Sequence, residues 1–138
     1  KEMEYRAWKK QNGAVEKEGM INEAIAVYEK AIIPQLPATH PYDRLMILYR
    51  KKKDYDNEVR IIKIAISVFM KENERRAGRI IEEDSSLYNQ VMQALETNES
   101  IRYEDGKWAF VQYDVMEYIT RLEKAQKLYK KSQEQSKL

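Results

Sequence analysis

The stretch GMINEAIAVYEKAII, residues 19–33, returns in altered form further along the chain as KDYDNEVRIIKIAIS, residues 53–67. Apolar and small residues keep their places at a constant offset of 34. The matched pairs are Ile21 with Tyr55, Val27 with Ile61, Tyr28 with Ile62, Ala31 with Ala65 and Ile32 with Ile66. A period of 34 residues is typical of repeats in which two antiparallel helices form a unit that stacks on the next. The sequence therefore predicts stacked helical hairpins.

Few residues in the chain can break a helix. The 138 residues include four Gly and three Pro, and all three Pro lie within residues 34–41. A composition of 43% hydrophobic and 35% charged residues suits a globular, charge-rich helical protein. We therefore expect one all-α domain over residues 1–138, taken from a longer protein because the first residue is not Met. No apolar run reaches the roughly 20 residues that cross a bilayer, so we expect a cytoplasmic protein without membrane contact.

Apolar residues at steps of three and four predict four helices in the first half of the chain. The first two run over residues 2–18 and 20–33. The connection IIPQLPATHP ends the second helix, with Thr39 or His40 as the cap and Pro41 in the first turn of the third. The third closes with the basic run RKKK, and the fourth extends over residues 54–76.

Aromatic and small residues of these helices follow a known motif. They are Trp8, Ala24, Tyr28 and Ala31 in the first unit, and Tyr42, Leu45, Tyr49, Tyr55 and Ala65 in the second. Over about residues 5–69 the chain resembles tetratricopeptide repeat proteins, which implies two antiparallel helix hairpins and a role in binding other proteins. Glu58 departs from the family pattern because it replaces the small central Ala. A carboxylate loses its hydration in a close helix contact, so we expect Val59 to face inward instead, or the second hairpin to be splayed.

In the resemblance, the first helix of each unit lines a concave groove that holds the ligand. The groove positions fall here on Arg6, Lys9, Lys10, Lys17, Arg44, Ile47, Arg50 and Lys51. Residues 1–81 hold 17 basic and 12 acidic residues, whereas residues 82–106 hold one basic and seven acidic residues. We therefore expect this groove to bind an acidic segment of another protein, or the acidic segment of this chain itself.

The second half of the chain carries weaker signals. Residues 85–95 predict a short helix within the acidic segment. The Asp-Gly pair at residues 105–106 is a hairpin signal, but apolar residues keep helical spacing from residue 108 on, and this longer pattern favours a helix over residues 107–131. We expect this helix to cap the open face of the second hairpin, with a second copy in a homodimer as the alternative cover.

No combination of residues suggests catalysis, a metal site or a cofactor. The chain has no Cys, its single His40 stands in a connection, and it has no Gly-rich phosphate loop. Basic residues at 50–53 and 75–79, with Tyr49 and Tyr55, raise the alternative of a nucleic-acid-binding module, but a net charge of +2 is small for one. We therefore expect a non-enzymatic interaction scaffold, with a structural or self-associating domain as the main alternative.

Overall fold

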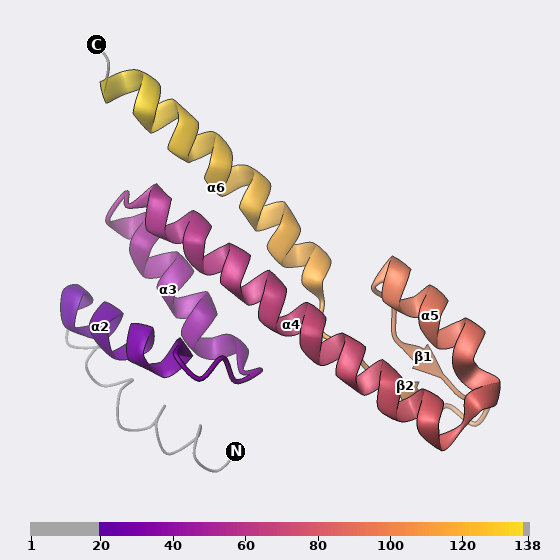
Figure 1. The fold of residues 1–138 in the computed structure, drawn as a ribbon. Helices are drawn as coiled ribbons and strands as arrows, with labels where there is room; N and C mark the ends of the chain where they lie inside the picture. Colours follow the sequence, from indigo (N-terminus) through magenta and orange to yellow (C-terminus); the bar gives the residue numbers. More distant parts are fainter. Residues whose placement is uncertain (1–19, 137–138) are drawn as a thin grey trace.

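The structure, a computed structural model, describes residues 20–136. The elements in chain order are α2 (Ile21–Ile32), α3 (Thr39–Lys51), α4 (Tyr55–Glu83), a 3-10 turn η1 (Ser85–Leu87), α5 (Tyr88–Thr97), β1 (Ile101–Arg102), β2 (Trp108–Phe110) and α6 (Val115–Ser136). Helices dominate this part of the chain, and a two-stranded hairpin is its one sheet, so the expected all-α class is confirmed. The helix expected over residues 2–18 lies outside the described residues. Figure 1 shows α4 as the long central helix, against which α3, α5 and α6 pack.

The helices α2, α3 and the first half of α4 pack in sequence, with α3 between the other two (Figure 1). Ala24 and Ala65 are fully buried, and their small side chains let the helix backbones approach closely. Ala31 is only half-buried, so this matched position is not part of the tightest contact. On α3 the motif residues Tyr42, Leu45 and Tyr49 are buried, together with Met46 and Leu48.

The helix ends follow local sequence signals, with two corrections. The N-cap of α3 is Ala38, which precedes both predicted candidates, Thr39 and His40, and Pro41 lies in the first turn as expected. Asp54 caps α4, since its Oδ1 accepts a hydrogen bond from the Asn57 backbone N–H at 3.3 Å. The prediction that α4 ends near residue 76 was wrong, because its buried Ala77 belongs to a second core that keeps the helix regular to Glu83.

The C-terminal helix α6 lies against the first half of α4 (Figure 1). The Tyr118 ring stacks on Phe69 of α4 with centroids 5.6 Å apart. The Tyr118 hydroxyl donates a hydrogen bond to Asp43 Oδ1 of α3 at 2.8 Å, so α6 contacts both helices of the α3 and α4 pair. Ala125 of α6 is fully buried in the same core.

A second, smaller core forms at the far end of α4. Its buried members are Ala77 of α4, Val91 and Ala94 of α5, and Phe110 of β2. β1 pairs antiparallel with β2, and the turn between them passes through Gly106, whose φ of 88° favours glycine. The predicted helix over residues 107–131 is therefore wrong at its start, because residues 108–110 form a strand whose Phe110 fills this core. The helix begins only at Val115.

The position of Glu58 corrects another expectation. Its side chain is 2% exposed and faces the core, and Oε2 lies 2.5 Å from Nη2 of Arg50 on α3. Val59 beside it is also buried, so both residues of this turn of α4 pack inward. The carboxylate occupies a helix contact because a guanidinium from the neighbouring helix compensates its charge.

Candidate functional site

The connection between β2 and α6, residues 111–114, is held by amide side chains from elsewhere in the chain. Asn73 of α4 is buried; it accepts a hydrogen bond from the Tyr113 backbone N–H at 2.7 Å and donates one to the Tyr113 carbonyl at 3.1 Å. Asn98 donates to the same carbonyl at 2.9 Å, and its Oδ1 accepts from the first two backbone N–H groups of α6 at 2.8 and 3.2 Å. Because Asn98 directly follows α5, these bonds tie the end of α5 to the start of α6.

An open groove of about 670 Å³ lies between α4, α5 and the first turns of α6. Its apolar lining consists of Met70, Met92, Leu95, Val115, Met116 and Ile119. Ile119 packs against the first core and Leu95 against the second, so the groove lies where the two cores meet. We call it the methionine groove. Helices α5 and α6 both pack mainly on α4, which leaves this space between them.

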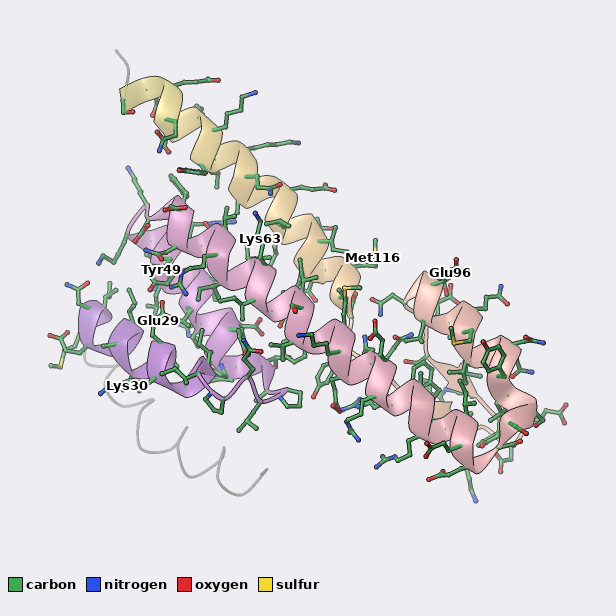
Figure 2. The ribbon with its side chains drawn as sticks, in the orientation of Figure 1. Glu29, Lys30, Tyr49, Lys63, Glu96 and Met116 are labelled. Carbon is green, nitrogen blue, oxygen red and sulfur yellow. The ribbon has the colours of Figure 1, made fainter. Side chains whose placement is uncertain are left out.

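Three methionine side chains of the groove remain open to solvent. Met70 is 47% exposed, Met92 43% and Met116 53%. Figure 2 labels Met116 at the start of α6 and Glu96 near the end of α5, on the two helices that flank the groove. Flexible, polarisable methionine side chains adapt to irregular apolar partners and are frequent at protein-binding surfaces. Their clustering here gives the groove an adaptable apolar surface.

The charged residues of the methionine groove are both acidic. Glu74 of α4 and Glu96 of α5 line it, whereas no Lys or Arg side chain of the described chain does so. Both carboxylates are exposed, and neither forms an ion pair within residues 20–136. The last turn of α5 has no basic residue to offset the partial negative charge of its carbonyl end. The groove is therefore apolar at its base and negative at its edge.

Half of the groove predicted from the repeat resemblance falls in the described part of the chain. Arg6, Lys9, Lys10 and Lys17 lie outside it, and the four placed residues are Arg44, Ile47, Arg50 and Lys51, all on α3. Ile47 is 37% exposed and Lys51 is exposed, whereas Arg50 is engaged by Glu58. The acidic segment, residues 82–106, packs mainly on the second half of α4. Its helix α5 lines the methionine groove, a surface that the resemblance did not indicate.

The basic residues considered for nucleic acid are partly neutralised within the fold. Glu72 forms ion pairs with Arg75 at 2.7 Å and with Arg76 at 3.2 Å. The hydrogen bonds from Arg75 hold the pKa of Glu72 below its usual value, so the carboxylate stays charged. Tyr49 is buried and hydrogen-bonded to Glu29, which removes it as a platform for base stacking.

A half-buried polar contact joins the first three described helices. Glu29 of α2 accepts hydrogen bonds from the Tyr49 hydroxyl of α3 and from Arg60 of α4. Burial and then the neighbouring Glu29 carboxylate raise the pKa of Tyr49 to about 12. Figure 2 shows Tyr49 and Glu29 labelled close together at this junction. Because the phenol keeps its proton at neutral pH, the contact is a structural tie between helices.

The remaining candidates for chemistry do not assemble into a site. His40 lies in the first turn of α3, with its ring 5.8 Å from that of Tyr28, and burial lowers its pKa. Within residues 20–136, no three His, Cys, Asp or Glu side chains are grouped so that they could hold a metal ion. None of the helices in this range combines the length and apolar character of a membrane span.

The fold and the groove define an all-α protein with an open apolar surface between two cores. Comparison of the chain with protein-family models, with curated proteins and with solved structures finds no match. Met92 and Leu95 fall within the short helix predicted over residues 85–95, but nothing in the sequence indicated that Met92 would stay exposed, because this depends on where α6 lies.

Proposed function

We propose that this chain is a cytoplasmic, non-enzymatic scaffold that resembles tetratricopeptide repeat proteins and binds a segment of another protein in the methionine groove. The observation that carries the proposal is the shared exposure of Met70, Met92 and Met116 across three helices. Scattered exposed apolar residues are ordinary, whereas a contiguous apolar hollow is typical of an interaction surface. Its volume also falls within the roughly 300 to 1,000 Å³ of ligand-binding pockets.

The geometry favours a partner that inserts apolar side chains. Complete burial of a Met side chain stabilises a contact by roughly 1.5 to 3 kcal/mol. Each of the three methionines is about half exposed, so a partner that covers all three gains a substantial part of this energy. The hydrogen bonds of Asn73 and Asn98 fix the base of the groove before the partner binds. A pre-formed surface lowers the entropy cost of association.

The basic face of α3 is a second candidate surface, as the repeat resemblance implies. Ile47 and Lys51 are solvent-exposed there, and the surplus of basic residues over residues 1–81 favours an acidic segment. Arg50 contributes less to this surface than the sequence suggested, because its charge is paired with Glu58. Substituting Arg50 would therefore test folding and binding together, and Lys51 is the better position for a charge reversal.

Site-specific photo-cross-linking in cells that make the protein separates these surfaces. A photoreactive phenylalanine analogue replaces Met92 or Met116 in the groove, or Ile47 on α3. The control position is Ile33, which directly follows α2 and is 75% exposed. We expect cross-links to another protein from the two groove positions. Equal yields from Ile33 and from the groove would contradict the proposal. Cross-links from Ile47 alone would favour the α3 surface, and a product of twice the chain mass would indicate self-association.

A further inference from the structure

We infer that the methionine groove takes a cationic amphipathic helix, with apolar side chains on the methionines and Lys or Arg side chains beside Glu74 and Glu96. The inference rests on the proposed function and adds the chemical class of the partner. It follows from the combination of an apolar base with an edge whose charged side chains are both acidic. An extended acidic segment or a phosphorylated one would meet like charge at this edge.

Two features of the groove select a helix in particular. The lining side chains come from α4, α5 and the first turns of α6, so they form the walls of an open trough. Peptide helices bind such troughs through apolar side chains spaced three and four residues apart. The neighbouring strands also offer little to a peptide in extended conformation, because β1 and β2 comprise only two and three residues and lie outside the lining.

The electrostatic environment supports a positive charge on the partner. Glu74 and Glu96 are exposed and not ion-paired within the described chain, so their charge is available. The positive end of the α6 helix dipole, at the start of α6, opposes this charge. It is offset by Glu117 in its first turn and by the oxygens of Asn98 and Asp114, which accept its backbone N–H groups. The charged side chains that line the groove therefore remain negative.

Three labelled peptides of 18 residues test the inference by fluorescence anisotropy. The first combines Leu at helical spacing with Lys on the other face, the second carries Glu in place of Lys, and the third keeps Lys but carries Ser in place of Leu. We expect the first peptide to bind about tenfold more tightly than the other two, because only it satisfies both the apolar base and the acidic edge.

Matched variants locate the binding site. Met92→Lys and Met116→Lys should each weaken binding of the first peptide about tenfold, because a charge would be placed in the apolar contact. Ile33→Lys, at an exposed apolar position directly after α2, should leave the binding of the first peptide unchanged. The double variant Glu74→Gln and Glu96→Gln should weaken binding about fivefold at low salt, with a smaller effect at high salt. Thermal melts should match among these variants, since all of these positions are solvent-exposed.

Several results would overturn the inference. Equal or tighter binding of the Glu peptide would refute the cationic partner, while the cross-linking result would still decide the proposed function. Binding that is insensitive to the methionine substitutions would refute the location. Self-association in sedimentation velocity that Met116→Lys abolishes would show that a second copy of the chain occupies the groove. Absence of binding by all three peptides would also refute a helical occupant.

Discussion

The hydrogen bonds between Asn73 and Tyr113 offer the sharpest test of how the groove is held in place. Asn73→Ala removes an acceptor 2.7 Å from the Tyr113 N–H and a donor 3.1 Å from the Tyr113 carbonyl. The carbonyl keeps its bond from Asn98, whereas the N–H loses its partner. An unsatisfied donor costs roughly 1 to 3 kcal/mol and the second lost bond about 1 kcal/mol, so we expect roughly 2 to 4 kcal/mol of destabilisation.

Urea denaturation followed by circular dichroism measures this loss directly. A domain of this size loses roughly 3 to 5 °C of melting temperature for each kcal/mol, so thermal unfolding should shift by about 10 °C as well. Asn89→Ala is the matched control, because Asn89 is exposed on α5 and also lines the groove. A free energy of unfolding for Asn73→Ala within about 0.5 kcal/mol of the control would refute the reasoning.

The variant Asn73→Asp adds a pH test of the same hydrogen bonds. A protonated carboxyl can donate to the Tyr113 carbonyl as the amide does, whereas a carboxylate cannot. Burial and the facing carbonyl oxygen should raise the pKa of the introduced carboxyl above its unfolded value of about 4. The folded variant then binds more protons than the unfolded one. Its free energy of unfolding should therefore be highest near or below pH 4 and should fall as the pH rises through the raised pKa. A difference in the free energy of unfolding between variant and wild type that stays constant from pH 4 to pH 8 would contradict this prediction.

Two further predictions concern the first core. Ala24→Leu should destabilise the fold by roughly 1 to 3 kcal/mol, because the larger side chain overpacks the contact of α2 with α3. Ala31→Leu, at a half-buried position, should destabilise it less. Equal melting temperatures of the two variants by circular dichroism would argue against the close contact at Ala24. Tyr49 should form its phenolate only near pH 12, so stability that is fully present below pH 10 should fall as the pH rises toward 12. Tyr49→Phe should reduce this alkaline loss of stability, measured by urea denaturation across the same pH range, and an unchanged pH dependence would contradict the assignment.

The sequence by itself determined most of the first described core. Helical spacing predicted α2, α3 and the start of α4 close to where they lie, and the motif residues Tyr42, Leu45 and Tyr49 of α3 are buried. Such local signals are readable because the buried residues of an amphipathic helix recur at a fixed spacing. A cap is also local: the Asp54 side chain accepts a hydrogen bond from the backbone N–H only three residues further on. The partner-binding residues expected on α3 rested on the resemblance to tetratricopeptide repeats, and their role in binding stays a prediction.

Tertiary structure decided the second half of the chain. Helical spacing continues from residue 108, yet residues 108–110 form a strand, because Phe110 packs against Val91 and Ala94, which lie far from it in sequence. Arg50 likewise explains why Glu58 is buried, through an ion pair between two helices. The methionine groove depends on such contacts throughout, since Asn98 sets where α6 begins relative to α5. Periodicity reports which residues share a face, but only packing between distant segments determines which of those faces stays uncovered.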